Sequence, residues 1–141
     1  MKATGIVRRI DDLGRVVIPK EIRRSLSIKE GDPLELFVDG KAICFVKYSP
    51  MVDYNAELTA ALKGLQLFGI NGAVYDNSDN KILGDRGAPM KQEYDPFNVN
   101  HYPIKIDDLH WGYFAPSRKL NDEEKKMLQL ALKIFVFKVT A

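Results

Sequence analysis

The arginines near the start of the sequence are the residues whose type and spacing most clearly suggest a chemical role. Residues 4–19 read TGIVRRIDDLGRVVIP and place Arg8, Arg9 and Arg15 beside two β-branched runs. A guanidinium group stays charged at every working pH and can bind a phosphate or a guanine edge through two hydrogen bonds. Strands would present these groups on a fixed surface. The pattern predicts a surface that contacts DNA, with a solvated basic hairpin as the alternative.

Positive charge is concentrated in the same part of the chain. Residues 1–25 hold seven Lys or Arg against three Asp or Glu, whereas the net charge of all 141 residues is only +2. A local basic patch on an otherwise balanced protein is typical of a protein that binds a polyanion. Lys2 joins the patch on the ground of its charge alone.

The composition indicates a globular protein that works in the cytoplasm. The sequence is 45% hydrophobic and 28% charged, which is close to the average of soluble domains. No apolar run reaches the roughly 18 residues that a bilayer requires, and the N-terminus lacks the core of a signal peptide. Cys44 is the only cysteine, so no internal disulfide can form. We expect no membrane partner.

No arrangement of residues predicts an enzyme or a metal site. The sequence lacks a Ser/His/Asp or Cys/His set, a glycine loop for phosphate and a pair of carboxylates suited to catalysis. Asp76 and Asp79 lack the glycine and the distant glutamate of a calcium loop. His101 and His110 have no third ligand at metal spacing, so we expect ordinary hydrogen-bonded histidines. No catalytic residue, metal or cofactor is predicted.

Two short strands and a helix are predicted to carry the basic residues. Residues 6–10 and 15–18 read as strands around a tight turn, in which Gly14 supplies the positive φ. Pro19 suits the first turn of a helix over residues 20–26. Arg23 and Arg24 would lie on the outer part of this helix, next to the hairpin.

A second hairpin predicts that the chain associates with a copy of itself. Residues 34–38 and 42–47 read as strands, and the Asp39-Gly40 turn between them is a strong hairpin signal. Both faces of this hairpin are apolar. A domain of about 50 residues can bury only one face of such a small sheet, so the second face needs a partner. We therefore expect a dimer.

Residues 1–50, and above all the motif DDLGRVVIPKEIRR, resemble the N-terminal domain of the AbrB/SpoVT transition-state regulators of spore-forming bacteria. The resemblance implies a swapped-hairpin β-barrel in which two chains interleave their strands. It also implies that arginines of both chains form one DNA-contacting surface. The DNA-binding positions of the family fall on Arg8, Arg15, Arg23 and Arg24. Arg9 and Lys2 are added by charge.

The rest of the chain, residues 51–141, is predicted to form a small α+β domain. Apolar residues recur at helical spacing after Pro50, and Asn121 with Glu124 favours the start of a last helix that is apolar on many sides. Such a helix should pack on its own sheet and on another subunit. The expected elements are a helix over 51–69, strands over 72–75 and 81–83, a long loop over 84–102, strands over 102–106 and 109–115, and a helix over 121–139.

This order of elements resembles a shortened GAF domain, a sensory module. The sequence shows no motif for a chromophore or a cyclic nucleotide, so it predicts no particular small-molecule effector. We expect a DNA-binding transcriptional regulator of the transition-state or sporulation type that binds double-stranded DNA as a homodimer or as a homotetramer through its C-terminal helices. The alternative is a MazE-like antitoxin whose C-terminal part binds a toxin.

Overall fold

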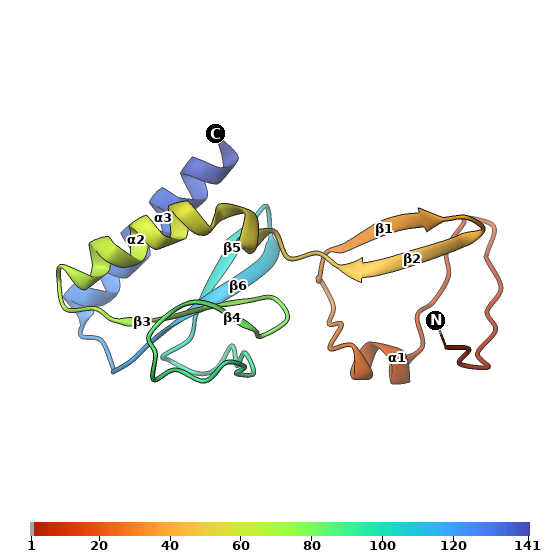
Figure 1. Cartoon of the computed structure of the whole chain (residues 1–141), viewed down its shortest axis with the longest axis horizontal. Coiled ribbons are helices and arrows are strands. Elements are labelled where there is room, and N and C mark those ends of the chain that lie inside the picture. The colour runs from red at the N-terminus through yellow and green to blue at the C-terminus, as the bar shows by residue number, and fades with distance from the viewer. Residues whose placement is uncertain (1) are drawn as a thin grey trace. The chain divides into compact units, whose positions relative to one another are not determined.

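The computed structural model describes residues 2–141, and these divide into two compact units. The first unit ends at Glu30, and the second runs from Gly31 to Ala141. Figure 1 shows the first unit in red tones and the second from orange to blue. The two units divide after residue 30, whereas the predicted domain boundary lies at residue 50. That boundary stays a prediction, because two chains that form the N-terminal domain together would include the hairpin over residues 34–47 in it.

The first unit contains one helix, α1 (Lys20–Ser25), and a tight turn. The predicted turn is confirmed: the Asp11 amide donates to the Arg15 carbonyl at 3.0 Å, and Gly14 has φ +77°. The strands predicted over residues 6–10 and 15–18 do not form. A strand requires a neighbour that pairs with its amides and carbonyls, and the single chain offers these segments none.

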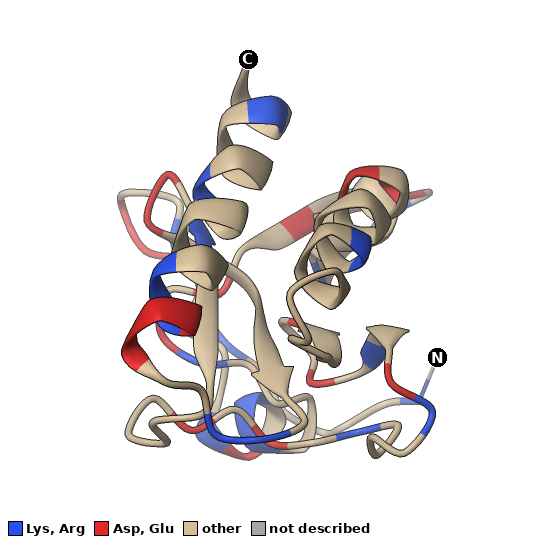
Figure 2. Ribbon diagram, turned by 90° about the vertical axis from the view of Figure 1, so that its left-hand side faces the viewer, with Lys and Arg blue, Asp and Glu red and all other residues tan. Residues whose placement is uncertain are grey.

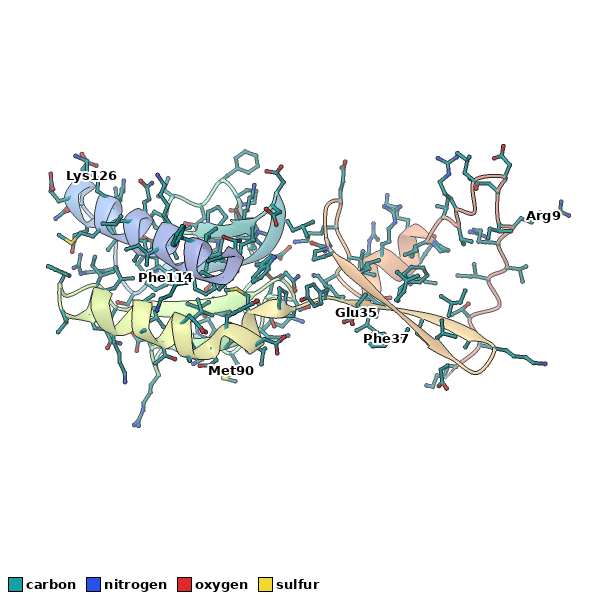
Figure 3. All side chains as sticks on the ribbon, turned by 90° about the horizontal axis from the view of Figure 1, so that it is seen from above. Arg9, Glu35, Phe37, Met90, Phe114 and Lys126 are labelled. Atoms are coloured by element: carbon teal, nitrogen blue, oxygen red, sulfur yellow. The ribbon has the colours of Figure 1, made fainter. Side chains whose placement is uncertain are left out.

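A separate antiparallel hairpin opens the second unit. It consists of β1 (Leu34–Asp39) and β2 (Ala42–Lys47), as predicted, and Gly40 at φ +58° makes the turn. Apolar side chains remain exposed on it, and Figure 3 shows Phe37 projecting from β1. The exposed apolar residues of the hairpin are Leu36, Phe37, Val38, Ile43, Phe45 and Val46.

The remainder of this unit is a four-stranded antiparallel sheet with two helices on one face (Figure 1). The strand order β4-β3-β6-β5 makes β3 and β6 the central strands. Every predicted strand of this region is present. The elements are η1 (Pro50–Tyr54), α2 (Asn55–Gln66), β3 (Gly72–Asp76), β4 (Lys81–Gly84), β5 (Tyr102–Ile106), β6 (Leu109–Pro116) and α3 (Asp122–Thr140).

The main core lies between the sheet and the helices α2 and α3. Leu58 and Leu62 of α2, Leu128 and Phe135 of α3, and Phe114 of β6 are all buried there. Figure 3 shows Phe114 in the part of the sheet that the two helices cover. Burial of this apolar surface is the main favourable contribution to the folding of this region.

The start of α3 is confirmed by a capping box. The Asn121 side chain accepts from the Glu124 amide at 2.9 Å, and the Glu124 carboxylate accepts from the Asn121 amide at 3.1 Å. Arg118 also binds this carboxylate and lowers the pKa of Glu124 to about 2, with help from the Asn121 amide. Figure 2 shows the acidic first turn of α3 in red.

The start of the first long helix differs from the prediction. Residues 50–54 form a 3₁₀ turn, and the α-helix begins only at Asn55 and ends at Gln66. Ser49 precedes this turn at its N-cap position, but its side chain makes no capping bond, and its hydroxyl instead donates to Asp76 Oδ2 at 3.3 Å. A tertiary partner for the hydroxyl has therefore replaced the local capping bond.

The long loop after β4 is an ordered cover for the other face of the sheet. The hydroxyl of Tyr75 donates to the Pro89 carbonyl at 2.8 Å, and that of Tyr113 donates to the Gln92 carbonyl at 2.7 Å. The two tyrosine rings are stacked with their centroids 5.0 Å apart. Burial raises the pKa of both tyrosines, so both hydroxyls remain donors at neutral pH.

His101 belongs to this covering loop, whereas His110 of β6 packs against it. The Nδ1 atom of His101 accepts from the Asp95 amide at 3.1 Å, and burial lowers its pKa despite the neighbouring Asp95 carboxylate. The His110 ring lies 4.6 Å from that of Tyr94. Hydrogen bonding is thus confirmed for His101. Among residues 2–141, no three His, Cys, Asp or Glu side chains gather closely enough to hold a metal, and no helix is long and apolar enough to cross a membrane.

Candidate nucleic-acid interface

All six predicted contact residues lie in the first unit with exposed side chains. Four of them precede α1, and Figure 3 shows Arg9 projecting from this part of the chain. The other two occupy the last turn of α1. The residues are Lys2, Arg8, Arg9 and Arg15 before the helix, and Arg23 and Arg24 within it.

The helix α1 is short, and its C-terminal end, which carries both arginines, is capped by backbone hydrogen bonds. Pro19 stands at the N-cap position, where its missing amide hydrogen leaves no donor unsatisfied. At the other end, the Ile28 amide donates to the Arg23 carbonyl at 2.8 Å, and the Ser27 amide donates to the Arg24 carbonyl at 3.2 Å. This pair of bonds is a Schellman motif, and it requires the positive φ of 55° at Ser27. The backbone that carries both arginines is therefore fixed.

Sequence reasoning missed this cap because the position is occupied by serine instead of glycine. Glycine adopts positive φ without strain, whereas a side chain makes that region less favourable. The signal that could have identified Ser27 as the cap is the end of the helical apolar pattern at Leu26, directly before it.

Arg15 is held by an acidic neighbour across the turn. Its Nε atom donates to Asp11 Oδ2 at 2.8 Å, and its amide donates to Asp11 Oδ1, also at 2.8 Å. The Leu13 amide donates to the same Oδ1 at 3.0 Å. The backbone amide and then the side chain of Arg15 lower the pKa of Asp11. The carboxylate therefore stays ionised while it holds Arg15.

The other predicted arginines of the first unit make no ion pair and are accessible to a partner. Arg8 donates only to the carbonyl of the preceding Val7, at 3.1 Å. Within residues 2–141, the side chains of Arg9, Arg23 and Arg24 make no hydrogen bond or ion pair. A shallow hollow of about 410 Å³ beside α1 is lined in part by Arg24 and Lys20. Exposed guanidinium groups without internal partners are suited to binding phosphates.

The comparisons with known proteins concern this same part of the chain. Residues 7–51 match the family described as "Antidote-toxin recognition MazE, bacterial antitoxin". Stage V sporulation protein T of Bacillus subtilis (strain 168) is 75% identical over 52 residues, which are 36% of this chain and 29% of that protein. The transition state regulatory protein AbrB of the same organism is 60% identical over 50 residues, 36% of this chain and 52% of that protein.

Among solved structures, the N-domain of the transcription factor AbrB is similar to this chain. Its sequence is 60% identical, the match covers 36% of this chain and 96% of that domain, and the TM-score is 0.34. The chain thus spans only about a third to a half of the length of the full-length relatives named above. The sequence matches confirm the resemblance predicted for the first fifty residues: the N-terminal region of the chain is a MazE/AbrB-type domain.

Proposed function

We propose that the chain is a transcriptional regulator of the transition-state or sporulation type that binds double-stranded DNA. The observation that carries this proposal is the set of exposed arginines, Arg8, Arg15, Arg23 and Arg24, in a region 75% identical to stage V sporulation protein T. In this reading the arginines neutralise phosphates and enter the major groove. A·T-rich DNA would bind more tightly, because its deformable duplex can adapt its shape to the protein surface. Such a regulator works in the cytoplasm and is not an enzyme.

The exposed apolar side chains support assembly through the N-terminal region. Large apolar residues are exposed both in the segment before α1 and on the β1–β2 hairpin, and Val7 and Val38 are 84% and 79% exposed. Two chains that interleave as a swapped-hairpin barrel would bury these groups and would give the segments over residues 6–10 and 15–18 strands to pair with. The same assembly would bring arginines of both chains onto one DNA-contacting surface.

The function is tested with the full chain and two fluorescein-labelled duplexes of equal length, one A·T-rich and one G·C-rich. We expect saturable binding followed by fluorescence anisotropy, with tighter binding to the A·T-rich duplex. The logarithm of the affinity should fall linearly with the logarithm of the salt concentration, with a slope of about −0.9 for each phosphate contact. Absence of binding, or binding without salt dependence, would contradict the proposal.

The helices α2 and α3 support a second contact between copies, which would make a tetramer. A groove of about 430 Å³ between them is lined mainly by small and apolar residues, including Gly64, Phe68, Leu130 and Ile134, with Glu57 and Lys138 also in the lining. Phe68, Leu130 and Ile134 are exposed in the single chain. A second copy presents the same self-complementary apolar face, as symmetric dimers require.

Ile134→Glu is expected to halve the subunit count of the full chain in sedimentation velocity. The variant places a charge in the groove, where a second copy would have to desolvate it. Gln129→Glu is the matched control, because it adds the same charge to an exposed position of the same helix outside the groove lining. If both variants sediment like the wild-type protein, the groove is not an interface.

The antitoxin reading is supported by the description of the family that residues 7–51 match. An antitoxin of this kind would use its C-terminal part to wrap a toxin, and such tails are extended. Here the part after residue 50 has a sheet, two helices and a buried core. We therefore prefer the interpretation as a transcriptional regulator to the interpretation as an antitoxin.

A further inference from the structure

The carboxylate of Asp11 lies next to an arginine that we assign to DNA contact, and a negative charge is unexpected at such a surface. Asp11 lies on the turn of the basic segment and bonds directly to Arg15. A negative charge beside DNA repels the phosphates, so on simple electrostatic grounds Asp11 should weaken binding. It must therefore have another effect if the segment is built to bind DNA.

The geometry of this pair points to a positioning role. We propose that Asp11 holds the Arg15 side chain in the orientation in which it meets DNA, an inference that rests on the proposed function. Asp11 Oδ1 is occupied by the amides of Leu13 and Arg15, at 3.0 and 2.8 Å, so the turn itself fixes the carboxylate. The remaining oxygen, Oδ2, accepts the Arg15 Nε at 2.8 Å.

The bond to Nε decides which edge of the guanidinium group remains available. Arginine can present a fork made by Nε and one terminal nitrogen, or a fork made by the two terminal nitrogens. With Nε bound to Asp11, the terminal fork of Arg15 is the one left for a partner. Within residues 2–141, its two nitrogens make no hydrogen bond, and the side chain is 70% exposed. A phosphate or a guanine edge accepts such a fork through two bonds.

Holding the side chain before DNA arrives should also strengthen binding. A free arginine loses its rotamer freedom when it binds, and ordering one long side chain lowers an affinity by about threefold to tenfold. Asp11 imposes this order in the unbound protein. Asp12, the next residue, has the same charge but makes no hydrogen bond or ion pair within residues 2–141. The two carboxylates therefore differ in their contacts and not in their charge.

The test compares Asp11→Asn with Asp12→Asn. In Asp11→Asn the amide oxygen can still accept from the amides of Leu13 and Arg15, so the turn is kept, but the NH₂ group cannot accept from the Arg15 Nε. Both variants remove one negative charge, so electrostatics alone predicts equally tighter binding of the A·T-rich duplex. We expect tighter binding only for Asp12→Asn, and binding about fivefold weaker for Asp11→Asn than for Asp12→Asn.

A double-mutant cycle separates positioning from a purely structural role. In an Arg15→Ala background, measured at low salt, Asp11→Asn should bind the duplex like Asp12→Asn, because no guanidinium group is left to position. The proposal is overturned if the two Asn variants bind equally in the wild-type background, or if the deficit of Asp11→Asn persists without Arg15. Failure of the wild-type chain to bind either duplex would instead overturn the proposed function, and the positioning role with it.

Discussion

Gly112→Ala is expected to unfold the four-stranded sheet. A Cβ atom at this position would lie 2.1 Å from the Tyr75 carbonyl oxygen and 3.1 Å from the Asp76 Cα atom. Both obstacles are backbone of β3, which pairs with β6 directly beside Gly112. Because β6 also pairs with β5 through the same residue, it cannot shift away without breaking a second ladder.

The expected loss is at least about 4 kcal/mol in the free energy of unfolding, a large part of the usual total of about 5–15 kcal/mol. Urea denaturation followed by circular dichroism measures it. Gly87→Ala in the loop after β4 is the matched control, because its Cβ atom would meet only Asp85 Oδ1, at an ordinary contact distance of 3.8 Å. It should leave the free energy of unfolding within about 1 kcal/mol of the wild-type value. A Gly112→Ala protein as stable as the wild type would contradict the close approach of β3 and β6.

Local signals predicted the second unit well. The Asp39-Gly40 turn, the Asn121 capping box and the strands of this unit each depend on neighbours in sequence, and the structure contains all of them. The covering loop was predicted only as a loop. The loop is held by hydrogen bonds from the hydroxyls of Tyr75 and Tyr113, which lie on strands outside it. A pattern of neighbouring residues cannot predict such bonds.

The first unit was predicted less completely. The turn at Gly14 and the helix α1 follow from local residues, but the flanking strands need partners that the single chain does not provide. The exposure of the basic residues could be predicted from their type alone. The Asp11–Arg15 pair was missed, because the two adjacent aspartates were read only as turn residues. The spacing of four residues across a glycine turn was the signal that could have found it.

Arg15→Ala and Arg23→Ala are each expected to weaken binding of the A·T-rich duplex by about tenfold, and the double variant by about a hundredfold. Each loses one guanidinium group per chain, and a good arginine contact is worth about 1–3 kcal/mol. One residue lies on the turn and the other on α1, so the losses should be nearly additive. Neither side chain is buried, and the melting temperature should therefore not change.

The salt dependence decides whether the lost contacts are contacts with phosphates. Each arginine removed from both chains of a dimer should reduce the magnitude of the salt slope by about 2, because about one counterion fewer is released for each lost contact. Lys105→Ala is the matched control, since Lys105 is an exposed cation on the edge strand β5, outside the basic segment. It should leave affinity and slope nearly unchanged. Weaker binding with an unchanged slope would mean that the arginines read base edges, whereas wild-type affinity and slope in both arginine variants would remove the basic segment from the DNA interface.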